Sequence, residues 1–251
     1  MEHYAPAQQV YAAGLIFARL GAIVMLIPGI GETFVPVRVR LSFALALALV
    51  LFPVVGATVP ALPADISAIV GAVIKETLIG MMIGGILRFF MSSLSAAGEI
   101  MSIQSTLGFS QTANPTQAAP STSLSTFLGL LGLVLIMTTN MHHLFLSAIV
   151  RSYTLFPFAR DIPLADANAL AVQTVSRSFA LGLQLAAPVV AFSLVFNIAA
   201  GMVGRVMPQF QIYFVTSPLM VIFSLSIFAL SLGVIGMVWL DHYRDLLAIF
   251  A

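Results

Sequence analysis

Few side chains in this sequence could do chemistry, and two of the charged ones interrupt apolar stretches. Arg19 lies in an apolar run that ends near Ile30, and Glu76 lies in another, with Lys75 beside it. A charge at the centre of a membrane-spanning helix costs about 3 kcal/mol on insertion scales, so such groups usually pair or face the interior of a helix bundle. Arg19 and Glu76 are therefore candidates for a structural ion pair. A proton-relay role for Glu76 is the functional alternative.

Patterns typical of catalytic and metal sites are missing from the sequence. It contains no HExxH, GxSxG or P-loop spacing. It also contains no cysteine, which excludes disulfides, thiolate metal sites and a cysteine nucleophile. His142 and His143 would point about 100° apart on a helix and could not easily share one ion, so with Asn140 they are more typical of hydrogen bonds between helices. We expect no enzyme activity, no metal and no cofactor.

The composition is that of a membrane protein. Of the 251 residues, 60% are hydrophobic and 8% are charged, whereas soluble domains carry about 25% charged residues. The mean hydropathy is +1.08, so most of the surface is suited to lipid or to equally apolar protein. The net charge is +1 and the basic residues are scattered, which gives nucleic-acid binding no support. The N-terminus lacks the basic region of a cleaved signal peptide, so we expect the first apolar segment to remain in the mature protein.

About six apolar segments, separated by glycine and proline, predict an all-α, polytopic membrane protein. A helix needs about 20 apolar residues to cross the hydrocarbon core, and glycine and proline mark the breaks between helices. We expect one compact bundle, a single domain that covers residues 1–251. The predicted segments are Val10–Ile30, Leu41–Val55, Ile66–Phe90, Leu124–Val150, Phe179–Val203 and Ile212–Leu240.

Gly80 and Gly84 are spaced so that they lie on one face of the third predicted helix. Two small residues four positions apart let the backbone of a neighbouring helix approach closely. We therefore expect another helix to pack at these glycines.

The stretch from residue 92 to residue 123 is small, polar and nearly uncharged. Its backbone groups could not face lipid without partners, because each unpaired group there costs several kcal/mol. The stretch must lie outside the bilayer or line a wet cavity. Its glycine, asparagine and proline residues also make it a poor straight helix. An ordinary connection outside the membrane and a pore-lining or plugging segment are the two interpretations that remain open.

The most specific motif lies between the fifth and sixth segments. Asn197 and Gly201 precede Arg205, and Pro208-Gln209 follows directly before an apolar helix. Further motifs occur upstream: Phe17-Ala18-Arg19, Pro28-Gly29-Ile30-Gly31, Val35-Pro36-Val37-Arg38, Glu76 with Leu78-Ile79-Gly80, and Ala97-Gly98-Glu99 continuing to Gly108-Phe109. In order and length, these motifs together resemble the FliR family of flagellar biosynthetic proteins, which also has members in virulence-type secretion systems.

The resemblance implies a subunit of the type III protein export gate in the flagellar basal body of the bacterial inner membrane. Such a subunit is built from helical hairpins and joins FliP and FliQ in a helical assembly, with FlhB- and FlhA-like components attached or nearby. Unfolded flagellar proteins would pass through the assembled channel, and membrane lipid would surround part of it.

The resemblance also implies roles for particular residues. The loop from about Thr106 to Thr122 is similar in place and composition to the family's plug, which closes the channel. Its gating residues would be Gly108, Phe109, Ser110, Gln111, Thr112, Ala113, Asn114 and Pro115. The assembly contacts would be Asn197, Gly201, Arg205, Pro208 and Gln209.

Three other functions compete with an export subunit of the flagellum. One is a secondary transporter that uses Glu76 or Arg19 as its coupling site, although transporters commonly show inverted repeats and this sequence shows no paired halves. The second is the equivalent subunit of a virulence-type secretion system. A membrane-embedded hydrolase ranks last, because no nucleophile and base have a suitable spacing.

Overall fold

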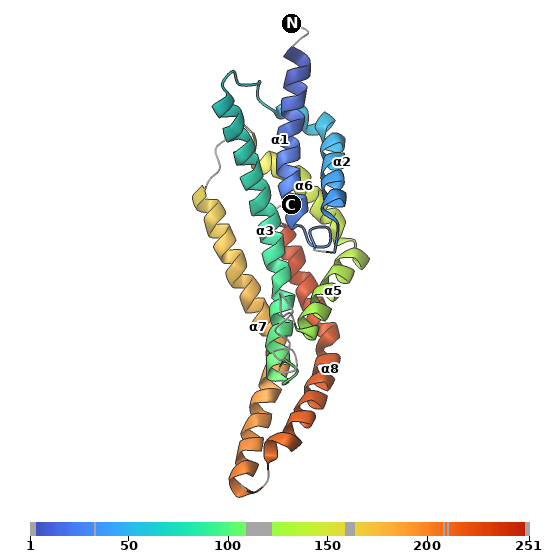
Figure 1. The fold of residues 1–251 in the computed structure, drawn as a ribbon, viewed down its shortest axis with the longest axis vertical. Coiled ribbons are helices and arrows are strands. Elements are labelled where there is room, and N and C mark those ends of the chain that lie inside the picture. Colours follow the sequence, from blue (N-terminus) through green and yellow to red (C-terminus); the bar gives the residue numbers. More distant parts are fainter. Residues whose placement is uncertain are drawn as a thin grey trace. The chain divides into compact units, whose positions relative to one another are not determined.

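The computed structural model describes residues 4–32, 34–108, 122–158, 164–207, 209 and 211–248. These residues form helices and no strand (Figure 1). Within this part of the chain, five helices are long and apolar enough to cross a membrane, and a broken helix pair would make a sixth span. The prediction of an all-α, polytopic membrane protein is confirmed. The elements are α1 (Tyr4–Leu26), α2 (Val37–Val55), the 3-10 turn η1 (Gly56–Thr58), α3 (Ile66–Gln104), α5 (Ser123–Thr138), α6 (Met141–Leu155), α7 (Leu164–Val206) and α8 (Ile212–Ala248).

Helix α3 is longer than predicted, because the first part of the polar stretch is helical up to Gln104. Small side chains make this possible. Ser93 and Ala97 are almost completely buried, and a Cβ atom on Gly98 would lie 2.5 Å from the Ser125 backbone nitrogen in α5. The small residues thus serve close helix packing here, and the expectation that the whole stretch is a poor helix was wrong for residues 92–104.

The fourth predicted segment is broken into α5 and α6, so the prediction of one continuous helix was wrong. Asn140 stands between them with φ 58° and ψ 21°, a left-handed conformation that asparagine tolerates better than most residues. The Thr139 hydroxyl donates to the Leu135 carbonyl oxygen over 2.6 Å at the end of α5. Hydropathy continues through the break and therefore gave no sign of it.

The last two predicted segments correspond to single helices that extend beyond the predicted bounds. Helix α7 begins at Leu164 rather than near Phe179, and α8 continues to Ala248 rather than ending near Leu240. Both extensions contain charged residues, which a reading based on apolar runs leaves out.

The chain folds into two compact units, and each is described by itself. Unit 1 comprises Met1–Phe90, Asn140–Val175 and Arg244–Ala251. In its core, α1 packs against α2 and α3. Leu15, Ile16 and Ile23 of α1 are at most 1% exposed. Helix α2 contributes mainly the small side chains of Ala44 and Ala48.

Unit 2 comprises Met91–Thr139 and Ser176–Tyr243, and Trp239 lies at the centre of its core. Its side chain is fully buried and its indole nitrogen donates to the Ser93 hydroxyl over 3.2 Å. A buried tryptophan usually finds such a partner. Gly132 and Gly182 let neighbouring helices approach α3, since a Cβ atom on either one would collide with Leu94 or with the Ser93 carbonyl oxygen.

Candidate functional site

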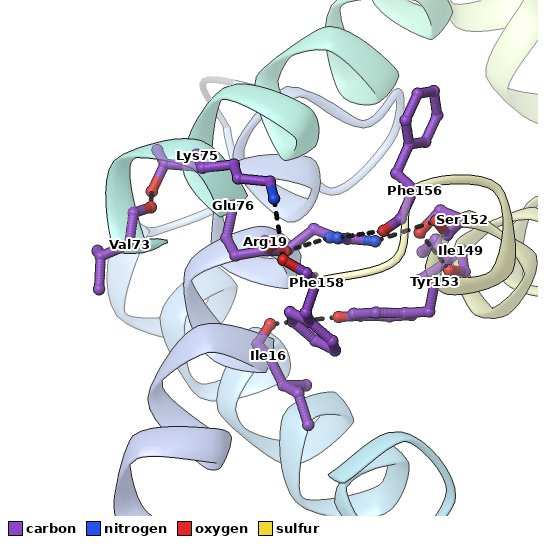
Figure 2. Close-up of polar contacts among 11 residues, drawn as sticks. Ile16, Arg19, Val73, Lys75, Glu76, Ile149, Ser152, Tyr153, Phe156 and Phe158 are labelled. Atoms are coloured by element: carbon purple, nitrogen blue, oxygen red, sulfur yellow. Dashed lines mark hydrogen bonds and ion pairs between the residues drawn. The ribbon is translucent and has the colours of Figure 1, made fainter. Parts of the chain in front are cut away.

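Arg19 and Glu76 are paired in the core of unit 1 (Figure 2). Arg19 is 0% exposed and Glu76 is 1% exposed. The Arg19 Nε atom donates to Glu76 Oε2 over 2.6 Å, so α1 and α3 are joined by the pair that the sequence suggested. A buried charge is tolerated only when it is paired and hydrogen-bonded.

The remaining nitrogens of the Arg19 guanidinium reach α6 and the residues after it. One terminal nitrogen donates to the Ser152 carbonyl oxygen over 3.0 Å and the other to the Phe156 carbonyl oxygen over 2.8 Å. The guanidinium carbon lies 4.3 Å from the ring centroid of Tyr153 and 5.2 Å from that of Phe158, within the range of about 6 Å for cation–π attraction. Each guanidinium nitrogen therefore has a partner, which favours a structural role for the pair over proton relay.

Gly80 and Gly84 bring α3 against α1 beside this pair. A Cβ atom on Gly80 would collide with the Arg19 carbonyl oxygen and lie 2.8 Å from the Ala22 Cβ atom. On Gly84 it would lie 2.8 Å from the Leu26 Cβ atom. The neighbouring helix expected at these glycines is therefore α1, and the close approach lets Arg19 reach Glu76 directly.

Most of the predicted plug lies outside the described residues. Of its gating residues, Phe109, Ser110, Gln111, Thr112, Ala113, Asn114 and Pro115 are not described, and Gly108 is. The Gly108 nitrogen donates to the Ser102 carbonyl oxygen over 3.0 Å, and Thr106, with φ 63°, adopts the left-handed conformation that often ends a helix. The first end of the loop is therefore folded back onto the end of α3.

The second end of the same loop is also attached to α3. The Thr122 backbone nitrogen donates to Glu99 Oε1 over 3.0 Å, and the Thr122 hydroxyl accepts from the Ser125 nitrogen over 3.3 Å and caps α5. Glu99 and Ser102 are one helical turn apart, so both ends of the loop meet the last turns of α3. Sequence reasoning did not single out Glu99 as a site residue, although it is the one charged residue between 92 and 123.

Helices α7 and α8 form a hairpin (Figure 1). Four of the predicted assembly residues are described, three in the last turns of α7 and Gln209 in the connection to α8. Asn197, Gly201 and Arg205 are spaced four apart and share one face of α7, and all three are exposed, as is Gln209. Pro208 lies outside the described residues.

The exposed face of this hairpin has few partners within the chain. Among the described residues, the side chains of Asn197, Arg205 and Gln209 form no hydrogen bond or ion pair. A Cβ atom on Gly201 would meet no atom within 4 Å. The chain's own packing therefore does not require a glycine at this position.

An apolar pocket of about 370 Å³ opens between the two arms of the hairpin. In the same two arms, Phe214 of α8 is 72% exposed and Val206 of α7 is 81% exposed. The hairpin therefore combines exposed apolar surface with polar side chains that have no partner among the described residues. The residues that line the pocket are Phe196, Ala199, Ala200, Val203, Met207, Ile212, Val215, Thr216 and Leu219.

Comparison with known proteins gives one consistent result. Residues 10–246 match the family described as "Bacterial export proteins, family 1". The flagellar biosynthetic protein FliR of Caulobacter vibrioides is 60% identical over 100% of both chains. FliR of Bacillus subtilis is 27% identical over 94% of both chains, and FliR of Escherichia coli is 28% identical over 84% of this chain and 80% of the relative. The chain therefore belongs to family 1 of the bacterial export proteins, the family of the flagellar biosynthetic FliR proteins.

Proposed function

We propose that this chain is a subunit of the flagellar type III protein export gate in the bacterial inner membrane, at the flagellar basal body. With FliP- and FliQ-like subunits it forms the channel through which unfolded flagellar proteins pass, near FlhB- and FlhA-like components. It supplies channel wall and partner contacts and does no bond-making chemistry. The observation that carries this proposal, beside the family membership, is the α7–α8 hairpin, whose exposed face is suited to contact with another protein.

The hairpin fits a protein partner better than it fits lipid. Apolar side chains such as Val206 and Phe214 could face either one. Asn197 and Arg205 of the same hairpin could not face hydrocarbon without hydrogen-bonding partners, because polar groups there are costly when unpaired. A neighbouring subunit would supply those partners, and Gly201 would let its backbone come close.

The loop that joins α3 to α5 is the proposed plug of the channel. Its two ends are attached to the same part of α3, through Ser102 at one end and Glu99 at the other. Residues 109–121 between them carry no charge, so the loop could hydrogen-bond to neighbouring loops when shut and move aside without dehydrating an ion. Glu99 then serves to keep the base of the plug in place.

Deletion of Ser110–Ala119 tests the plug. The assembled channel should leak ions in the deleted variant, because nothing would close it, and electrical conductance across a bilayer measures the leak. Replacement of the same ten residues by glycine and serine serves as the matched control. It keeps the length of the loop and removes the contacts that the plug's own side chains make. Unchanged conductance in the deletion variant would reject the plug role.

Co-purification tests the assembly. The tagged full-length chain, extracted from flagellated cells with a mild detergent, should bring FliP- and FliQ-like subunits with it. A chain that purifies alone and moves a small solute by itself would support the secondary transporter instead.

A further inference from the structure

The C-terminal end of α6 is held by two cations that come from other helices of unit 1 (Figure 2). Arg19 of α1 donates to the carbonyl oxygens of Ser152 and Phe156 over 3.0 Å and 2.8 Å. The Lys75 Nζ atom of α3 donates to the carbonyl oxygen of Phe158 over 2.9 Å. All three acceptors are main-chain oxygens within seven consecutive residues.

One of these oxygens belongs to the last turn of α6, where the Ser152 carbonyl oxygen also accepts from the Phe156 nitrogen over 2.9 Å, and the other two belong to residues just after the helix. The carbonyl groups at the end of a helix carry the negative end of the helix dipole, and those just beyond it need donors from elsewhere in the protein or from water. Ser152 is 0% exposed and Phe158 is 7% exposed, so water has little access to this end of the helix. Cations that donate hydrogen bonds here add a donor to each oxygen and oppose the negative end of the helix dipole.

We propose that Arg19 and Lys75 are positioning residues that form a carbonyl clamp, defined as their three hydrogen bonds to Ser152, Phe156 and Phe158. The clamp fixes the end of α6 and the residues after it against α1 and α3. Glu76 acts through Arg19, because it offsets the buried charge and orients the guanidinium. This role is independent of the proposed export channel.

Aromatic side chains hold the clamp in shape. The rings of Tyr153 and Phe158 both lie within cation–π range of the Arg19 guanidinium, and their centroids are 5.5 Å apart. The Tyr153 hydroxyl also donates to the Ile16 carbonyl oxygen of α1 over 3.4 Å. The guanidinium plane is thereby confined so that its two terminal nitrogens meet the two carbonyl oxygens.

The clamp differs from a simple ion pair between α1 and α3 in what it requires. It requires hydrogen-bond donors at positions 19 and 75, because its acceptors are main-chain carbonyl groups. A pair that only joins α1 to α3 requires opposite charges at positions 19 and 76, in either order. The double variant Arg19→Glu/Glu76→Arg restores the charge pair but places a carboxylate against the Ser152 and Phe156 carbonyl oxygens.

A cysteine at position 152 reports on the clamp. Ser152→Cys keeps the main-chain oxygen and introduces the one thiol of the chain, which has no native cysteine. Its reaction with a small maleimide in native membranes should be slow while the end of α6 is held. A second reporter, Thr154→Cys, lies at an exposed position on the same turn and should react at one rate in every background.

Arg19→Ala should raise the labelling rate at position 152 by about tenfold or more, because local opening exposes the thiol. The charge-swapped double variant should remain as fast as Arg19→Ala. Slow labelling in the charge-swapped variant would overturn the clamp in favour of a simple ion pair between α1 and α3. An unchanged labelling rate in Arg19→Ala would overturn both the clamp and the simple ion pair.

Lys75→Met decides the question even if Arg19→Ala fails to accumulate. It removes one donor of the clamp and leaves the Arg19–Glu76 pair in place. We expect labelling at position 152 to rise about threefold, a smaller effect because one of three hydrogen bonds is lost. A rate equal to that of the parent reporter would contradict the participation of Lys75 and with it the proposed clamp.

Discussion

The Arg19 site in unit 1 and the α7–α8 hairpin in unit 2 differ in whether their polar side chains have hydrogen-bonding partners within the chain. Arg19 has a partner for each guanidinium nitrogen within its own chain. Arg205 of the hairpin is exposed and forms no ion pair with the described residues. At the first site, folding of the chain supplies the hydrogen-bonding partners. At the second site, another molecule could supply them.

Glycines show the same contrast. A Cβ atom on Gly80 would collide with the α1 backbone, whereas one on Gly201 would meet nothing within 4 Å. Because a side chain at position 201 would meet no described atom within 4 Å, a substitution there tests the surface of the hairpin and not its packing. The two regions therefore predict different outcomes for similar substitutions.

The largest effect on stability is expected at the buried pair. Arg19→Ala would leave the Glu76 carboxylate buried without its guanidinium, which typically costs about 3–5 kcal/mol. We expect a lower temperature of unfolding in detergent and less chain in the membrane. Arg205→Ala is the matched control, since an exposed arginine should change the free energy of unfolding by less than about 0.5 kcal/mol. Equal losses in the two variants would remove the contrast between the regions.

A smaller effect is expected at the glycine contact between α1 and α3. Gly80→Ala should destabilise the chain by about 1–3 kcal/mol, because its Cβ atom would force the two backbones apart. Thermal unfolding of the purified chain measures this effect. Gly85→Ala on the same helix provides the comparison, since a Cβ atom there meets nothing within 4 Å. If Gly80→Ala were as stable as Gly85→Ala, the close contact of Gly80 with α1 would not determine how α3 packs against α1.

A local effect is expected at the base of the loop after α3. Glu99→Ala removes the acceptor for the Thr122 nitrogen, and a lost hydrogen bond to a charged group costs about 1.5–3 kcal/mol where it is buried and less at a partly exposed site. We expect faster hydrogen exchange of the Thr122 amide with little change in the unfolding temperature. Protection of that amide as strong as in the parent chain would mean that Glu99 does not hold the loop.

The sequence was sufficient to predict those features of the protein that follow from hydropathy and from the cost of buried charge. The apolar runs predicted the helices, and the two charges inside them suggested that Arg19 and Glu76 pair. The break at Asn140 was missed because it depends on one left-handed residue within a continuous apolar run. The carbonyl acceptors of Arg19 were also missed, because any residue carries a carbonyl oxygen and the sequence does not mark which one will be near. Glu99 could have been found as the lone charge in an uncharged stretch.

The central claim is that the exposed face of the α7–α8 hairpin binds a partner subunit. Substitution Gly201→Leu tests it most directly, because the new side chain has open space in the isolated chain and would obstruct only a neighbour. The measurement is the amount of FliP-like subunit that co-purifies with the tagged chain, relative to the chain itself. We predict normal accumulation of the chain in the membrane and a loss of partner of about tenfold, the effect of 1.4 kcal/mol in binding. Normal accumulation with full recovery of the partner would contradict the claim.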